Sequence, residues 1–385
     1  MKVFLSLLSR EFKLFWSNKV LVLLFIGAPV LYGILIGSVY QKGIVDQLPI
    51  LIVDQDRSEL SRKAITMIED NHSVSIAKIL YDTHQMHETA TTHNATCVVV
   101  IPKNFEKDIL LKRYPEIISY INTANLLTAN ITSTALQLSL GTLRAGIEIE
   151  ALQKQGMPEE IAFTQFEPFK MSFIRMNNRS TNYLYFLWPG VLATVFQQVL
   201  LLGLALSFAQ EYENGTFSEL INRTSNTLKL MLVKSLPYLI MSIGIWILYI
   251  LFANWFRVPI HSNFLALTLI AGIFVVAVTT IGILVSIILP SQLKATEVLM
   301  VVATPSFMIS GFTWPLDQMP VWVQSIANGI PLTHFLKAFR ILMVEAGSIK
   351  QTLPSIYAML LIAIICGTAA YIALYFKIKK YKKAH

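Results

Sequence analysis

Charged residues are scarce in this sequence. Only 14% of the 385 residues are Asp, Glu, Lys or Arg, whereas 54% are hydrophobic and the mean hydropathy is +0.57. Roughly a quarter of the residues of a water-soluble domain are charged, so the composition argues against a soluble protein. Because the apolar residues cluster in long runs rather than being scattered, we predict membrane spans.

The sequence also lacks the motifs that identify a P-loop ATPase, a metal site or a disulfide framework. A Gly-x-x-x-x-Gly-Lys-Ser/Thr loop is missing, which excludes a P-loop ATPase on this chain. The two cysteines, Cys97 and Cys366, lie in a hydrophilic segment and in an apolar run, so neither a zinc motif nor a disulfide framework is predicted. His84, His87 and His93 lack the spacing of a metal site. We therefore expect no catalytic site, metal or cofactor on the chain itself.

Ionisable residues are nearly absent from the interiors of the apolar runs. Lys234, Lys294 and Glu297 lie near predicted cytoplasmic edges, whereas secondary transporters place such groups within their spans. An external ATPase is therefore a better energy source than an ion gradient. Gln197 and Gln198 lie in mid-span, where amides need partners. We expect them at a subunit interface or a translocation path, with a local hydrogen bond as the alternative.

Six apolar segments are candidates to cross a bilayer, which takes about 20 residues. They are Val20–Tyr40, Leu184–Phe208, Leu230–Ala253, Phe264–Leu289, Ala295–Phe312 and Pro354–Phe376. The fifth is shorter and starts with a polar turn. We predict an α-helical polytopic membrane protein with six transmembrane helices, the first over residues 20–40 and five more within residues 184–376. The first run is too long for the core of a signal peptide.

Basic residues flank the first and last spans. They are Lys2, Arg10, Lys13 and Lys19 before the first span, and Lys377, Lys379, Lys380, Lys382 and Lys383 after the last. The positive-inside rule therefore predicts that both termini are cytoplasmic, which requires an even number of spans. Residues 1–19 have apolar side chains at helical spacing and predict an amphipathic interfacial helix, with an extension of the first span as the alternative. Residues 377–385 are predicted to be a basic cytoplasmic tail.

Residues 41–183 differ in character from the rest of the chain. They carry 14 Lys and Arg against 16 Asp and Glu, which leaves a net charge of +10 on the remainder. That distribution fits cytoplasmic loops and excludes a nucleic-acid groove. Strand-like runs occur at Leu48–Val53, Val74–Leu80, Thr96–Ile101, Ile117–Ile121 and Phe169–Met176, and helix-compatible stretches at Ser58–Asp70, Asn104–Lys112 and Ala124–Gln155. We predict an inserted α/β domain on the extracytoplasmic side.

The loop after the second span contains a group of candidate functional residues, which are Glu211, Glu213, Gly215, Thr216 and Glu219. Thr216 and Glu219 have the spacing of a capping box, in which the Thr hydroxyl accepts from the Glu219 amide. We therefore predict a short cytoplasmic helix that begins at Phe217, within about residues 210–225. A well-capped loop helix without a functional role is the alternative.

The segment before the last span is interrupted by Gly311, Pro315, Pro320 and Pro331. Proline prevents a continuous helix, and broken backbone at membrane depth must be sheltered by protein or line a cavity. We predict re-entrant helices over about residues 313–345, with an ordinary extracytoplasmic loop as the alternative.

Three groups of residues together resemble a known family. They are Glu213-Asn214-Gly215-Thr216 with Glu219-Leu220; Ser310-Gly311-Phe312-Thr313-Trp314-Pro315 with Met319-Pro320 and Ile330-Pro331-Leu332-Thr333; and Leu48-Pro49-Ile50 through Val53-Asp54-Gln55-Asp56-Arg57-Ser58 with Val100-Ile101-Pro102-Lys103-Asn104-Phe105. Their order and spacing resemble the type-2 ABC exporter permeases, in the branch with a large extracytoplasmic domain between the first and second transmembrane helices. The basic residue usual near the start of that family's coupling motif is missing here, where Tyr212 lies between two glutamates.

The resemblance implies a transport subunit of the bacterial inner membrane rather than an enzyme. It implies ABC ATPase subunits that bind ATP and Mg, a second permease that is identical or paralogous, surrounding membrane lipid, and export of an amphipathic or hydrophobic substrate. Whether a periplasmic adaptor protein extends the route stays open, and nucleic acid is not expected as a partner. The alternative is a membrane-anchored receptor or assembly scaffold with a ligand-binding extracytoplasmic domain, for which two spans would suffice.

Overall fold

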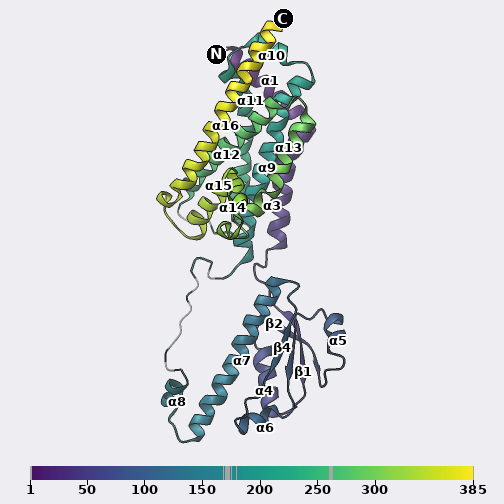
Figure 1. Cartoon of the computed structure of the whole chain (residues 1–385), viewed down its shortest axis with the longest axis vertical. Coiled ribbons are helices and arrows are strands. Elements are labelled where there is room, and N and C mark those ends of the chain that lie inside the picture. The colour runs from purple at the N-terminus through teal and green to yellow at the C-terminus, as the bar shows by residue number, and fades with distance from the viewer. Residues whose placement is uncertain are drawn as a thin grey trace. The chain divides into compact units, whose positions relative to one another are not determined.

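The computed structural model describes residues 2–167, 169, 174, 176–178, 180–259 and 263–384. The chain divides into two compact units, a helical unit of residues 1–43 and 175–385 and a sheet unit of residues 44–174 (Figure 1). Most of the strand-like run predicted over Phe169–Met176 lies outside the described residues.

The sheet unit is built on four strands, which are β1 (Leu48–Asp54), β2 (Val74–Leu80), β3 (Cys97–Ile101) and β4 (Ile118–Ile121). Their order is β2-β1-β3-β4, with β1 parallel to both of its neighbours and β4 antiparallel to β3. The two central strands are almost fully buried, as expected of continuous apolar runs that are covered on both faces. Each of these strands agrees with its predicted run to within one residue at either end.

The helices of the sheet unit are α4 (Glu59–Glu69), α5 (Met86–Thr92), α6 (Phe105–Leu110), α7 (Leu126–Lys154) and α8 (Glu159–Phe166). α4, α6 and α7 share an apolar core with one face of the sheet, and α5 packs on the other. The turn from β1 into α4 is fixed by the buried carboxylate of Asp54, which accepts from the backbone N–H of Arg57 and from Ser61 Oγ, both at 3.0 Å. Part of the third motif of the family resemblance therefore has a structural role here.

The helical unit contains α1 (Lys2–Ser17), α2 (Lys19–Val22), the π-helical turn η1 (Leu23–Gly27), α3 (Ala28–Val39), α9 (Tyr183–Glu213), α10 (Phe217–Arg223), α11 (Thr227–Trp255), α12 (Phe264–Ile288), α13 (Gln292–Ile309), the 3₁₀ turn η2 (Leu316–Gln318), α14 (Val321–Asn328), α15 (Pro331–Phe339), the π-helical turn η3 (Arg340–Val344) and α16 (Ile349–Ala384). Asn18, Asn182 and Asn226 begin α2, α9 and α11, because each side chain accepts from first-turn amides.

Five of the described helices are long and apolar enough to cross a membrane. They are Lys19–Val39, Tyr183–Glu213, Thr227–Trp255, Phe264–Ile288 and Ile349–Lys383. The protein is thus mostly helical, with five candidate spans. The sixth predicted span corresponds to α13, which has 18 residues and carries Lys294 and Glu297 near its start. These charged side chains lower its mean hydropathy, which is why α13 is not among the five.

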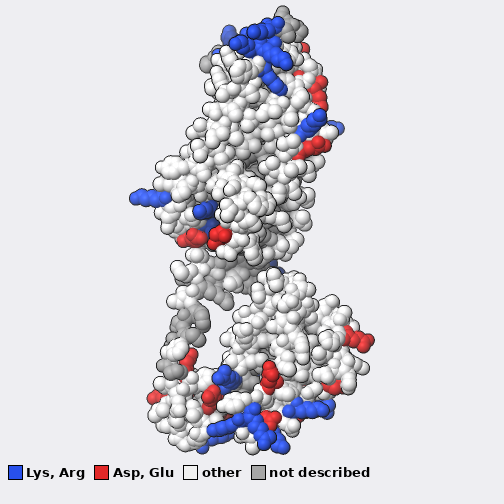
Figure 2. Space-filling model, viewed as in Figure 1, with Lys and Arg blue, Asp and Glu red and all other residues white. Residues whose placement is uncertain are grey.

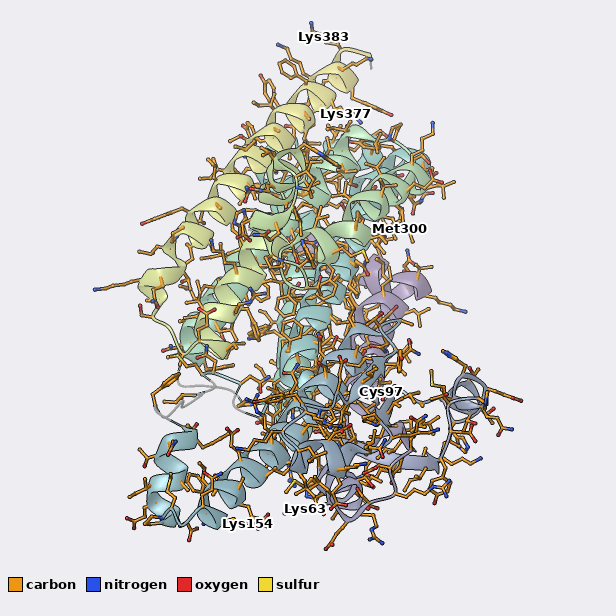
Figure 3. All side chains as sticks on the ribbon, turned by 60° about the horizontal axis from the view of Figure 1, so that its bottom comes forward. Lys63, Cys97, Lys154, Met300, Lys377 and Lys383 are labelled. Atoms are coloured by element: carbon orange, nitrogen blue, oxygen red, sulfur yellow. The ribbon has the colours of Figure 1, made fainter. Side chains whose placement is uncertain are left out.

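Helix α9 is the central helix of this unit, because it packs against α3, α11, α12 and α13 and is buried along most of its length. Lys and Arg gather at the end of the unit where α16 ends, whereas uncharged residues dominate much of the surface below (Figure 2). Lys377 and Lys383 lie on that last part of α16 (Figure 3). An apolar band beside a basic end is typical of a protein embedded in a membrane.

Candidate coupling site

The predicted short helix is present as α10, and it begins at the predicted residue, Phe217. α9 ends at Glu213, and Gly215 then has a φ of +69°, in the left-handed region that favours glycine. Phe217, Leu220 and Ile221 of α10 are buried. One apolar face therefore holds this helix to the rest of the unit.

The predicted capping box between Thr216 and Glu219 is wrong. Thr216 has helical dihedral angles (φ −83°, ψ −1°) rather than the extended angles of an N-cap, and its side chain makes no cap hydrogen bond. Thr216 Oγ1 instead donates to Glu211 Oε2 at 2.5 Å. The physical reason is that leaving a buried carboxylate short of donors costs more than leaving a turn amide exposed to water.

Glu211 is the centre of a group of charged side chains, which we call the charge cluster and which consists of Arg10, Glu11, Glu211 and Lys234. All of them are buried except Arg10, whose side chain is 25% exposed. The side chain of Glu211 is 3% exposed. Arg10 donates to its two oxygens at 2.7 and 3.0 Å, and Lys234 Nζ donates to Oε1 at 2.6 Å. With Thr216 these make four hydrogen bonds to one carboxylate, three of them between opposite charges, which are the strong kind.

The second carboxylate, Glu11, balances the cluster. It accepts from Lys234 Nζ at 2.8 Å and from Arg10 Nη1 at 2.8 Å. The hydrogen bond to Glu211 raises the pKa of Arg10 above its ordinary value, so the guanidinium keeps its charge. Because separating these helices would leave buried charges uncompensated, the cluster fastens α1, α9 and α11 to one another.

Glu213 makes a separate link. Gln292 Nε2 donates to Glu213 Oε2 at 2.5 Å and Ser291 Oγ to Oε1 at 3.4 Å, which joins the end of α9 to the start of α13. Glu219 is exposed on α10. The candidate coupling residues therefore differ in position. Glu211 and Thr216 are hydrogen-bonded to each other within the unit. Glu213 and Gly215 lie at the turn between α9 and α10, and Glu219 is exposed on the surface.

Aromatic side chains connect α10 to the end of α16. The ring of Phe217 lies between those of Tyr212 and Tyr381, at centroid distances of 4.7 and 5.3 Å. Lys377 Nζ lies 4.0 Å from the centroid of the Tyr212 ring and donates to the carbonyl of Ile287. Tyr212, which lies between Glu211 and Glu213, thus packs inward against a lysine of α16.

Gln197 lies at a seam between two helices of the same chain. Its side chain is buried, and Nε2 donates to Ser306 Oγ of α13 at 3.1 Å. Its Oε1 has no hydrogen-bond partner among the described residues. Gln198 is half-buried. The hydrogen bond that we considered for these glutamines is therefore present for Gln197, and a place at a subunit interface or a translocation path stays a prediction.

The segment around the three prolines consists of short helices. α13 is followed by Gly311, whose φ of +80° turns the chain. Pro315 and Pro320 precede η2 and α14, and Pro331 is the first residue of α15, so each opens a helix where a missing N–H is tolerated. The guanidinium of Arg340 donates to the carbonyl oxygens of Gly311 and Phe312 at 3.3 and 2.9 Å, which holds this segment to η3.

Three residues of the charge cluster, Arg10, Glu11 and Lys234, were not predicted as site residues. Glu11 lies between Leu7 and Phe15 on the buried side of α1, and a carboxylate inside an apolar stripe is the pattern that identifies it. Lys234 is the corresponding exception in the apolar run of α11. Each charge predicts that an opposite charge lies nearby, although sequence alone does not say which one.

Known proteins with related sequences identify the family. The model of the ABC-2 family transporter protein matches residues 19–372. "Probable multidrug ABC transporter permease YbhR" of Escherichia coli K12 is 23% identical over 89% of this chain and 90% of its own length. "Inner membrane transport permease YhhJ" of the same strain is 22% identical over 83% of both chains. "Linearmycin resistance permease protein LnrN" of Bacillus subtilis is 23% identical over 86% of this chain and 88% of its own. Because the family match extends from the start of the first candidate span into the last, the chain belongs to the ABC-2 family of transporter proteins.

Proposed function

We propose that this chain is the permease subunit of an ATP-driven exporter, and that ATP and Mg are bound by separate ABC ATPase subunits. The observation that carries the proposal is α10, a short helix fastened to the membrane helices beside a buried charge cluster, in a chain that matches the ABC-2 family over residues 19–372. The missing phosphate loop is consistent with an ATPase on another polypeptide.

The outward face of α10 suits contact with an ATPase. Glu219, Asn222 and Arg223 are exposed, and the last two follow Glu219 by three and four residues, so they share one side of the helix with it. A displacement of α10 is transmitted to Glu211 by the hydrogen bond from Thr216. The charge cluster transmits it from Glu211 to α1 and α11. ATP binding then shifts a pair of permeases between inward-open and outward-open states, because the ATPase favours one position of α10 over the other.

Contacts at the α10 end of the unit support six crossings of the membrane. α1 reaches Glu211 through Arg10, and α16 reaches Phe217 through Tyr381. Both chain ends are drawn at this end of the unit (Figure 1). Two chain ends on one side of a membrane require an even number of crossings, so α13 is the sixth. Its polar start lies at the same end, since Gln292 contacts Glu213.

In this proposal both termini and α10 lie in the cytoplasm of a bacterium, as the basic residues that flank the first and last spans favour. The sheet unit then lies outside, because residues 44–174 follow a single crossing. A second permease, identical or paralogous, completes the pathway in the inner membrane. The substrate is amphipathic or hydrophobic. The names of YbhR and LnrN, which refer to multidrug transport and linearmycin resistance, support that substrate class.

The topology is tested by labelling introduced cysteines. Glu88→Cys and Lys382→Cys are made in a background without Cys97 and Cys366, and intact spheroplasts are treated with a membrane-impermeant maleimide. We expect modification at position 88 and none at position 382 until the membrane is permeabilised. The reverse pattern contradicts the proposed orientation.

The coupling role is tested with a charge reversal on the outward face of α10. Glu219→Lys with Arg223→Glu alters the proposed ATPase contact without touching the buried face, and Lys229→Glu, exposed at the start of α11, is the matched control. After reconstitution with the co-expressed ATPase, we expect the double variant to assemble in the membrane but to lose ATP-dependent transport. Transport equal to that of the control variant would show that the ATPase contacts another surface.

A further inference from the structure

We propose that the last turns of α16 bind the headgroups of anionic lipids in the membrane around them. The surface consists of four exposed lysines, Lys379, Lys380, Lys382 and Lys383, which we call the lysine face. Lys and Arg gather at this end of the helical unit (Figure 2), and Lys383 is labelled there in Figure 3. The proposal requires that α16 crosses a membrane, and it goes beyond the exporter function because no ATPase takes part.

The positive charge of the lysine face is not compensated within the chain. No Asp or Glu follows Glu345 in the sequence. Among the described residues, none of the four lysines forms an ion pair, whereas the buried Lys234 pairs with Glu11 and Glu211. Like charges placed this close together repel one another unless anions lie beside them. A partner with negative charge is therefore expected.

The lysine face continues the side of α16 that carries exposed apolar residues. Positions 361, 365, 372, 376, 379 and 383 follow one another in steps of four, seven, four, three and four residues, so they lie on one side of the helix. The first four are Leu361, Ile365, Ile372 and Phe376, which are 53–61% exposed. Only 22% of this candidate span is buried, the lowest share of the five. Because exposed apolar side chains of a span contact lipid tails, the lysines on the same side contact lipid headgroups.

The length of α16 places the lysine face at the depth of the headgroups. The apolar run Pro354–Phe376 has 23 residues, which span about 35 Å at 1.5 Å per residue and so cross a hydrocarbon core of about 30 Å. Lys379 and Lys383 follow Phe376 by three and seven residues, which puts them about 5–10 Å beyond it. The headgroup layer is about 5–8 Å thick on each side, and the long side chain of a lysine can direct its ammonium group into that layer.

Contacts on the other side of α16 turn the lysine face away from the rest of the unit. Ile378 is 5% exposed, and the ring of Tyr381 packs against that of Phe217 in α10 at a centroid distance of 5.3 Å. Tyr381 is two residues from both Lys379 and Lys383, so it projects from the opposite side of the helix. The lysine face is thus directed away from α10, which favours lipid over an ATPase as its partner.

The test measures which lipid lies next to the end of α16. Phe376→Cys, in a background without Cys97 and Cys366, is labelled with a bimane fluorophore, and the full chain is placed in phosphatidylcholine nanodiscs. A small fraction of either phosphatidylglycerol or phosphatidylcholine carries a nitroxide near the headgroup, which quenches bimane on contact. We expect the relative association constant to favour phosphatidylglycerol about five- to thirtyfold, as contact with one or two lysines provides. The preference should fall at high salt, which screens these charges.

Two variants with the same change of net charge identify the residues responsible. The first combines Lys379→Gln, Lys380→Gln, Lys382→Gln and Lys383→Gln, and the control combines Lys63→Gln, Lys103→Gln, Lys107→Gln and Lys112→Gln, all exposed in the sheet unit. We expect the first variant to bind the two lipids equally and the control to keep the preference.

Three results would overturn the proposal. They are equal quenching by the two lipids in the wild type, a preference that the first variant retains, and loss of the preference when excess glycerol 3-phosphate is added. The last result would assign the lysine face to soluble phosphates rather than to lipid. The assay contains no ATPase and no nucleotide, so its failure leaves the exporter proposal untouched.

Discussion

The buried polar groups near the two ends of α9 differ in how fully they are hydrogen-bonded. Near its last turn, the carboxylate of Glu211 accepts four hydrogen bonds, and every charge of the cluster faces an opposite one. Near its start, Trp188 belongs to an aromatic wall in which the hydroxyl of Tyr249 lacks a partner among the described residues. A fully paired group holds helices in one arrangement. The first end is thus held by charged hydrogen bonds, whereas the second leaves one buried hydroxyl without a described partner.

The largest expected effect comes from Lys234→Met, which removes the cation that both carboxylates share. Glu11 and Glu211 then face each other with only Arg10 to compensate them, and we expect the free energy of unfolding to fall by about 3–5 kcal/mol. Lys229→Met changes an exposed lysine of the same helix and is the matched control. Thermal unfolding of both variants in one detergent gives the difference. Equal unfolding temperatures would show that the cluster does not hold the helices together.

A smaller effect is expected from Thr216→Val, which keeps the shape of the side chain but removes its hydrogen bond to Glu211. A hydrogen bond to a charged group is worth about 1.5–3 kcal/mol. Thr216→Ser retains the hydroxyl and serves as the control. Hydrogen exchange should become faster in α10 for the valine variant and stay unchanged for the serine variant. Faster exchange in both would mean that the methyl group, rather than the hydroxyl, fixes α10.

The smallest expected effect is that of Tyr249→Phe on stability. Because the buried hydroxyl makes no described hydrogen bond, its removal loses no hydrogen bond and relieves the cost of its burial, so the free energy of unfolding should stay unchanged or rise by about 1 kcal/mol. Ser306→Ala is the comparison, since Ser306 Oγ accepts from Gln197 and donates to Ala303 O, and it should cost about 1 kcal/mol. A clear loss of stability in Tyr249→Phe would reveal a partner for the hydroxyl and remove the contrast between the two ends of α9.

Local patterns in the sequence were sufficient for part of the fold, although α5 and α8 were not predicted. The apolar runs predicted β1 to β4, and the spacing of Thr216 and Glu219 predicted the start of α10 at Phe217, although the capping box itself is not formed. The prolines predicted short helices, although each proline opens a helix rather than interrupting one. These features depend on neighbours within a few residues, which is why periodicity and turn chemistry find them.

The partners within the candidate site were not predictable in the same way. Arg10 and Glu211 are 201 residues apart, and the spacing of neither residue points to the other. The capping box failed for a related reason, since Thr216 and Glu219 have the correct local spacing but a carboxylate of the preceding helix takes the hydroxyl. A buried charge implies that a partner of opposite charge or a hydrogen-bonding partner exists, whereas the fold determines which residue that partner is.

The residues of the charge cluster lie far apart in the sequence, so they are synthesised at different times. Glu11 is made among the first residues, but Lys234, its buried partner, is made 223 residues later. At about 5–20 residues per second, the ribosome needs roughly 11–45 s to cover that distance. Until then only the neighbouring Arg10 can pair with Glu11, so we expect α1 to stay where water can solvate this carboxylate. Assembly of the N-terminal helix is therefore a late event, completed only after the third candidate span has left the ribosome.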